Sequence, residues 1–270
     1  MRTGQRSIGA VATAAIVLLV AGACGSSRRV ATKAPPKTTT TLASAPSTTA
    51  APGSATTVAP TGPTTRSTSS TSANLPLWPF RTSTEASDWQ ADYRSGGHQP
   101  WHLDAGETAL SFAKGYLGYG EIDTVTGTTT NASGAHVGVG FVNPNGVKHT
   151  AAVVHLFKWG SGSDAPWEVA GTDDTDFSLT SPAYGATVHS PATVGGKITG
   201  VDENIKVFVR QISSSSAIGT FCCQPAGGDD SDWHATVSYS GATDSVLTIA
   251  ASTGGHLKGV ERFTVTGVRH

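Results

Sequence analysis

Acidic residues are absent from the first 84 positions of the chain, and the first of them is Glu85. Eight of the 18 Lys and Arg residues lie before that position, which leaves 10 basic against 19 acidic side chains in the remainder, a balance of −9. A protein that binds nucleic acid needs a basic surface on its folded part. The charge distribution therefore argues against nucleic acid as a partner.

Motifs of the common enzyme classes are missing as well. The sequence has no G-x-S-x-G, no phosphate-binding loop and no dinucleotide fingerprint, so no nucleophile has a recognisable base and orienting partner. Ser111–Lys114 matches the S-x-x-K of penicillin-recognising enzymes, but Lys197–Gly200 does not supply the K-T-G strand that those enzymes also need. We predict that the protein is not an enzyme and holds no cofactor.

The N-terminus has the pattern of an export signal. Two arginines precede an apolar run at residues 8–23, which is short for a membrane span because a span needs about 20 apolar residues. The segment Val20–Cys24 resembles the lipobox of bacterial lipoproteins, which implies that the Cys24 thiol takes a diacylglycerol and becomes the mature N-terminus. The three small residues before this cysteine also fit ordinary signal peptidase, which would leave the chain secreted. We predict a signal peptide at residues 1–23 and a lipid anchor at Cys24.

Residues 24–75 consist mostly of Thr, Ser, Ala and Pro. Such a segment buries too little apolar surface to offset the entropy lost on ordering, so we predict a disordered tether. Its basic residues would lie near anionic lipid headgroups while the acidic part of the chain is held away from them. This arrangement suits a protein anchored on the extracytoplasmic face of the cell membrane.

The remaining residues are predicted to form two small domains, 76–172 and 176–270, because the composition shifts at the acidic stretch between them. In the first, apolar residues at helical spacing predict a helix over 84–93, and a second helix runs from a capping Asp104 to Gly118. Alternating apolar residues then predict antiparallel strands: 137–141, 147–159 and 167–170. Helices followed by an antiparallel sheet make this an α+β domain.

The second domain has short strand patterns at intervals of about 8 to 12 residues, the spacing expected of an all-β sandwich. The predicted strands are 177–180, 187–189, 193–199, 205–211, 220–223, 233–239, 246–251 and 262–268. Proline has no N–H to donate to a neighbouring strand, so Pro182 and Pro191 should lie at strand ends or on an edge strand.

Four stretches of this part resemble the immunoglobulin-like domain of bacterial spore germination proteins: Phe177–Pro182, Val188–Gly196, Ile205–Arg210 and Asp232–Trp233. The resemblance covers roughly 95 residues at the C-terminus. It implies an immunoglobulin-like sandwich in a non-enzymatic exported module that binds other molecules. It implies no catalytic residues.

Cys222 and Cys223 are neighbours in the chain, and in an oxidising compartment they can form a disulfide with each other. Consecutive side chains of a regular strand point to opposite faces, so this bond requires a distorted backbone. The bond could simply stiffen the end of a strand, or it could act as a redox switch. Free or intermolecular thiols are the remaining alternative.

Asp229, Asp230 and Asp232 offer several carboxylates in one predicted loop, and Asp202 could join them from a neighbouring loop. Their spacing does not match an EF-hand, so we expect a solvated acidic loop, with calcium as the alternative. Residues 224–231 are then a plausible contact region for a ligand, because loops at the ends of sandwiches often bind partners.

Histidines and tryptophans are the other candidates for function. The pairs His98 with His102 and His149 with His155 do not lie on a confident helix at zinc-ligand spacing, so we expect structural or exposed roles and no metal site. Three further aromatic residues cluster around the first helices: Trp78, Trp89 and Trp101. They could stack on sugars or anchor a partner, although core packing is the commoner role of such rings.

These patterns together predict an exported, lipid-anchored protein of the bacterial cell envelope that binds without catalysis. Its partner could be a wall polymer, an envelope protein or a small ligand. One alternative is an envelope enzyme with a pocket between the first domain's helices and its sheet, where His149 or His155 would face inward beside an acid. The other is a redox-responsive protein that uses Cys222 and Cys223.

Overall fold

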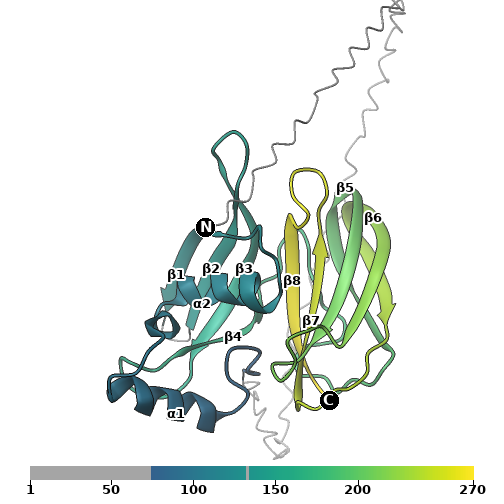
Figure 1. The fold of residues 1–270 in the computed structure, drawn as a ribbon. Coiled ribbons are helices and arrows are strands. Elements are labelled where there is room, and N and C mark those ends of the chain that lie inside the picture. The colour runs from purple at the N-terminus through teal and green to yellow at the C-terminus, as the bar shows by residue number, and fades with distance from the viewer. Residues whose placement is uncertain (1–73, 132–133) are drawn as a thin grey trace, which may run out of the picture. The chain divides into compact units, whose positions relative to one another are not determined.

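The computed structural model describes residues 74–131 and 134–270 (Figure 1). These residues are mostly antiparallel β-sheet with few helices, so the predicted predominance of antiparallel strands is confirmed. The predicted signal peptide, Cys24 and nearly all of the predicted tether lie outside the described residues.

Two helices precede the strands. Helix α1 (Ser83–Arg94) covers the helix predicted at 84–93, and the Thr82 hydroxyl accepts from the Glu85 N–H at its start. Helix α2 (Ala105–Ser111) begins as predicted, because Asp104 Oδ1 accepts from the Glu107 N–H at 2.9 Å. The prediction of one helix up to Gly118 is imprecise, since α2 continues as the π-helical turn η2 (Phe112–Tyr116). A 3₁₀ turn, η1 (Pro100–Leu103), lies between α1 and α2.

The first sheet has the order β1-β2-β3-β4, and every neighbouring pair is antiparallel. Its strands are β1 (Thr124–Asn131), β2 (Gly134–Val142), β3 (Lys148–Lys158) and β4 (Trp167–Thr172). The last three lie where the sequence predicts strands. Strand β1 escapes prediction because Val125 is the only apolar residue besides glycine in TVTGTTTN, so the segment lacks a period-2 apolar pattern.

The second sheet has the order β6-β5-β7-β8. Its strands are β5 (Ala192–Arg210), β6 (Gly219–Val237), β7 (Val246–Thr253) and β8 (Arg262–Arg269). The sequence predicts four short strands where the structure has the two long strands β5 and β6. The predicted loop at 224–231 is wrong, because pairing with β5 continues through it with two register shifts. Bulges at residues 227 and 229–230 accommodate the extra residues, and Pro225 pairs with Asn204.

Residues 176–181 pair with the first half of β5. The Ser178 N–H donates to the Lys197 carbonyl, and Gly195 exchanges hydrogen bonds with Ser181. Pro182 follows this pairing directly, and Pro191 immediately precedes the first residue of β5. Both prolines therefore lie at the ends of paired segments, as predicted, where no ladder hydrogen bond requires their N–H.

Two hydrophobic cores meet at β7 and β8. Leu247, Ile249 and Ala251 of β7 belong to the core of the second sheet, whereas Ala250 packs in the core beneath the first sheet. In β8, Val265 joins the first of these cores and Val268 the second. The first core therefore draws side chains from both of the segments predicted as separate domains.

Candidate functional site

The predicted lipidation site, Cys24, lies outside the described residues, so the structure gives no information about it. Among the helices that the structure does describe, none is long and apolar enough to cross a membrane. Membrane attachment through Cys24 remains a prediction from the sequence.

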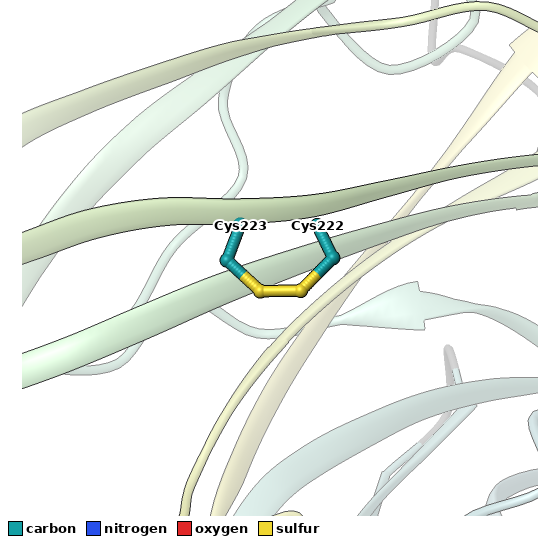
Figure 2. The surroundings of a disulfide bond; sticks show 2 residues. All are labelled: Cys222 and Cys223. Carbon is teal, nitrogen blue, oxygen red and sulfur yellow. A yellow bond between two sulfur atoms is a disulfide. The ribbon is translucent and has the colours of Figure 1, made fainter.

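Cys222 and Cys223 lie on β6 and are joined by a disulfide (Figure 2). In the pairing with β5, Lys206 faces Cys222 and Ile205 faces Gln224, so Cys223 is an extra residue in β6. A bulge of this kind interrupts the alternation of side chains that would otherwise keep two consecutive sulfur atoms on opposite faces. Both cysteines are exposed, so the bond is accessible from solvent.

Asp229, Asp230 and Asp232 are exposed on β6, and Lys197 of β5 lies beside two of them. The Lys197 Nζ is 3.0 Å from Asp232 Oδ1 and 3.5 Å from Asp230 Oδ2. The hydrogen bond to Asp232 is the main reason why the pKa of Lys197 is raised. Within residues 74–131 and 134–270, no three His, Cys, Asp or Glu side chains form a group that could hold a metal ion. The side chain of Asp202 is outside the description.

In the structure, His155 and His149 do not contact each other but stack on other rings. His155 of β3 stacks on His136 of β2 with ring centroids 4.6 Å apart, and His136 Nδ1 lies 2.6 Å from Asp173 Oδ2. Burial lowers the pKa of His155, and the neighbouring His136 lowers it further. His149 stacks instead on Phe141, at 5.0 Å.

The space between the helices and the first sheet is filled by core side chains. Phe112 and Tyr116 of η2 pack there with Phe141 and Leu156 of the sheet, and all four are buried. His155 follows Val154 and precedes Leu156, both of which point into this core, so its ring lies on the opposite face. The pocket that the enzyme hypothesis places in this space is therefore occupied by the protein's own side chains.

Aromatic residues gather before and around the first helices. Trp78 and Trp101 stack with ring centroids 5.4 Å apart, and the ring centroids of Trp89 and Phe80 are 6.2 Å apart. The three tryptophans are only partly buried. The cluster therefore packs as the sequence predicts for aromatic rings, yet it keeps part of each indole at the surface.

A groove of about 410 Å³ opens beside Trp78. It is lined by Trp78, Glu107, Leu110, Ser111, Lys114, Gly115 and Asp123. The residues from α2 and η2 recur at helical spacing, so they share one face of the helix, opposite the face that packs in the core. The groove falls within the size range of small-ligand sites, which is about 300 to 1,000 Å³.

Trp78, one of the residues that line this groove, is held in place by backbone and aromatic contacts. Its backbone is tied to β4, since Val169 N–H donates to the Trp78 carbonyl at 2.8 Å and Leu77 N–H donates to the Val169 carbonyl at 2.9 Å. Trp101 supports one face of the ring. Glu107, Asp123 and Lys114, which are exposed and also line the groove, can then form hydrogen bonds with a ligand that stacks on the indole.

Two other grooves are less suited to a ligand. One, of about 510 Å³, lies along β4 and β8, but its Tyr184 hydroxyl already bonds to the Leu75 backbone. The other, of about 390 Å³, is lined by Arg81, whose guanidinium is already paired with Glu85. One prominent polar side chain of each groove, Tyr184 or Arg81, is thus already bonded within the chain.

Two ionisable side chains are buried next to the aromatic cluster. Burial raises the pKa of Glu168 well above its usual value, although its Oε2 accepts from the Phe80 N–H at 3.2 Å. Burial lowers the pKa of His102 to about 4, and its ring stacks on that of Trp101. Within the described residues, Glu168 Oε1 and His102 Nδ1 have no hydrogen-bond partner.

The sequence names only part of this groove in advance. Trp78 is among the tryptophans considered for sugar stacking, whereas Glu107 is not singled out and Lys114 appears only in the S-x-x-K match. No sequence pattern marks Asp123 as a site residue. It lines the groove because it directly precedes β1, which starts next to the groove. The available signal is the polar stripe at helical spacing on the outer face of the second helix.

Comparison with known proteins gives no relatives: no family model matches the chain, and it matches no curated protein and no solved structure.

Proposed function

We propose that this protein is exported, is anchored to the outer face of the cell membrane through Cys24, and binds a cell-wall saccharide without transforming it. The groove beside Trp78 is its contact site. The predicted tether of residues 24–75 gives the folded part reach into the wall.

The proposed architecture is the α+β domain at 76–172 followed by the immunoglobulin-like sandwich at 176–270. The first part is supported by the order of its elements, since α1 and α2 precede the four antiparallel strands. The second is supported by the pairing of residues 176–181 with β5 and by a core that alternate residues of β5, β6 and β7 share.

The partly exposed indole of Trp78 is the observation that carries the proposal. Sugar rings present an apolar face of C–H groups, which stacks on an aromatic ring, and an equatorial fringe of hydroxyl groups, which bonds to polar side chains. The groove offers both elements, because Glu107 and Asp123 accept hydrogen bonds and Lys114 donates them. A wall polymer is therefore favoured over an apolar small molecule.

Saccharide binding is tested with the full chain carrying Cys24→Ala, which removes the anchor. Tryptophan fluorescence is followed during titration with chitotetraose, and sedimentation with insoluble peptidoglycan measures polymer binding. Trp78→Phe and Lys114→Ala should each weaken binding by roughly tenfold, the loss expected of one removed contact. Lys206→Ala, an exposed change outside the groove, serves as the control. Equal affinity in all variants would refute the groove as the site.

The anchor has its own test. Cells are labelled with a radioactive or clickable fatty acid, palmitate for instance, and the protein is recovered from wild type and from the Cys24→Ala variant. We expect label in the wild type alone, together with release of the variant into the medium. Label in both proteins, or in neither, would reject Cys24 as the lipidation site.

A redox role is the second candidate, favoured by the exposure of the Cys222–Cys223 disulfide on β6. Alkylation with and without reductant measures whether this bond opens under mild conditions, and peptidoglycan binding is compared in both states. A Cys222→Ser, Cys223→Ser double variant that behaves like the wild type in both assays would count against this role.

A further inference from the structure

The two sulfur atoms of the Cys222–Cys223 disulfide lie in different surroundings. Lys206 of β5 faces Cys222 in the pairing with β6, whereas Cys223 is the extra residue of the bulge. The next pair along the two strands is Ile205 with Gln224, which places an apolar and an uncharged residue beyond Cys223. The two ends of the bond are therefore not equivalent.

Lys206 brings a positive charge close to Cys222. Residues directly opposite each other in antiparallel strands have their Cβ atoms about 4.5 to 5.5 Å apart, on the same face of the sheet. Both side chains are exposed, and Figure 2 shows the two sulfur atoms on one side of the β6 ribbon. Within the described residues, the Lys206 ammonium takes part in no hydrogen bond or ion pair. It can therefore interact with charge that develops on the Cys222 sulfur.

Other charged side chains on the neighbouring strands are distant or already bonded. The nearest acidic residue of β6 beyond the disulfide is Asp229, which at about 3.3 Å per residue lies roughly 20 Å further along the strand. Arg210 of β5 donates to the Ser215 carbonyl and lies over the Tyr116 ring. Strand β7, which pairs with β5 on its other side, contains no charged residue. Among the side chains described on these three strands, Lys206 is therefore the charge nearest to Cys222.

The disulfide is not needed to hold the sheet together. A disulfide stabilises a protein mainly by closing a loop in the unfolded chain, and this effect grows with the number of residues in the loop. Cys222 and Cys223 are adjacent, so their loop is the shortest possible. Pairing of β6 with β5 continues on both sides of the two cysteines. Opening the bond should therefore leave the fold intact.

We propose that Cys223 is a modification site, at which a low-molecular-weight thiol forms a mixed disulfide while Cys222 is released as a thiolate. The attacking thiolate bonds to the Cys223 sulfur, the bond between the two cysteines breaks, and its electron pair passes to the Cys222 sulfur. The sulfur of the small thiol is oxidised and the Cys222 sulfur is reduced, so no further reactant is required. Attack of the Cys222 thiolate on the mixed disulfide expels the small thiol and restores the original bond.

The leaving group decides which cysteine is modified. In thiol–disulfide exchange, the sulfur that forms the more stable thiolate leaves faster. A neighbouring ammonium stabilises a thiolate, so Lys206 favours the departure of Cys222 over that of Cys223. The same charge favours the Cys223 mixed disulfide at equilibrium, because the free thiolate then lies beside Lys206. The assignment of Cys223 rests on the redox role proposed above and is independent of saccharide binding.

The test uses the full chain with Cys24→Ala, which removes the third cysteine. The protein is equilibrated in mildly alkaline buffer with 2-mercaptoethanol, which has no charged group besides its thiolate. Acid then stops the exchange, and mass spectrometry with fragmentation between residues 222 and 223 locates the mixed disulfide. We expect the amount on Cys223 to exceed that on Cys222 at least about twofold. High salt should reduce this excess, because it screens exposed charges.

Variants of Lys206 separate the effect of charge from that of shape. Lys206→Gln should give equal amounts on both cysteines, whereas Lys206→Arg keeps the charge and should keep the excess on Cys223. Lys197→Gln is the control, because Lys197 lies on the same strand but beside Asp232, and it should also keep the excess. Unchanged melting temperatures in the three variants ensure that a difference does not reflect misfolding.

Three results would overturn the proposal. A disulfide that stays closed at high thiol concentration would remove the redox role and the modification site together. A disulfide that opens but carries the small thiol equally on both cysteines, or mainly on Cys222, would reject Cys223 and leave the redox role standing. An excess on Cys223 that is unchanged in Lys206→Gln would reject Lys206 as the group that directs the reaction.

Discussion

The backbone N–H of Val265 on β8 donates to the Thr172 hydroxyl at the end of β4 across 2.8 Å. Thr172 Oγ1 also lies 3.2 Å from the Thr264 hydroxyl. Since β4 belongs to the first sheet and β8 to the second, one side chain connects both sheets. The contact adds a directional link to the shared hydrophobic core.

Replacing Thr172 by valine should separate this link from simple packing. The shape of the side chain is kept, but the buried Val265 N–H loses its acceptor, which costs about 1 to 3 kcal/mol of unfolding free energy. Chemical denaturation monitored by circular dichroism measures the loss. Thr236→Val, an exposed change on β6, should cost much less. Equal stability in both variants would mean that the hydrogen bond does not contribute.

Glu168→Gln should change how stability depends on pH. Burial holds the Glu168 pKa well above its ordinary 4.5, so the folded chain favours the protonated acid. Its contribution to stability is complete below pH 4.5 and is lost as the pH rises through the raised pKa. Between pH 4.5 and the raised pKa, the unfolding free energy of the wild type should fall by about 1.4 kcal/mol per pH unit relative to the glutamine variant.

Denaturation at a series of pH values checks this prediction. Exposed Glu107 provides the control, because Glu107→Gln replaces the same functional group without changing a buried site. The prediction fails if the unfolding free energy of Glu168→Gln differs from that of the wild type by the same amount at every pH, as expected for Glu107→Gln. That result would mean that the carboxyl group of Glu168 is ionised in the folded protein.

The sequence predicts the helices and most strands because local signals decide them. Asp104 caps α2 as its position before an apolar stripe indicates. Strand β1 is different, since its threonines become a strand only through pairing with β2. The continuity of β5 and β6 is also non-local, because each strand faces another of equal length, and Gly200 pairs with Gly228 between two bulges despite the preference of glycine for turns.

The candidate site was predictable only in part, for a similar reason. An isolated tryptophan in a sequence is compatible with core or surface, and the partial exposure of Trp78 depends on its stacking against Trp101 and its pairing with β4. Asp123 and Lys114 line the same groove although they are nine positions apart, because Asp123 directly precedes β1 and Lys114 lies on η2. Neither fact follows from local periodicity.

His102→Phe should remove a source of acid sensitivity. Burial lowers the pKa of His102 from 6.5 to about 4, so protonation favours the unfolded chain. The folded chain keeps its full stability above pH 6.5 and loses up to about 3 kcal/mol as the pH falls towards 4. Phenylalanine preserves the contacts with Trp101 and Phe80 and does not titrate. Thermal melts between these pH values measure the effect. As the pH falls, the melting temperature of His102→Phe should decline less than that of the exposed-site control His98→Gln.

Gly196→Ala tests why two glycines stand together in β5. A Cβ on Gly196 would collide with the carbonyl oxygen of Ser178, and one on Gly195 would lie 2.6 Å from the Trp233 carbonyl oxygen. Both obstacles are backbone atoms of paired segments, so they cannot rotate away as a side chain would. We expect Gly196→Ala to lower the unfolding free energy by about 1 to 3 kcal/mol, the usual cost of forced shifts in a packed structure. Gly120→Ala, where a Cβ meets no atom within 4 Å, should be neutral in the same denaturation assay. A Gly196→Ala protein as stable as the Gly120→Ala protein would mean that residues 176–181 do not pack against β5 as closely as the structure places them.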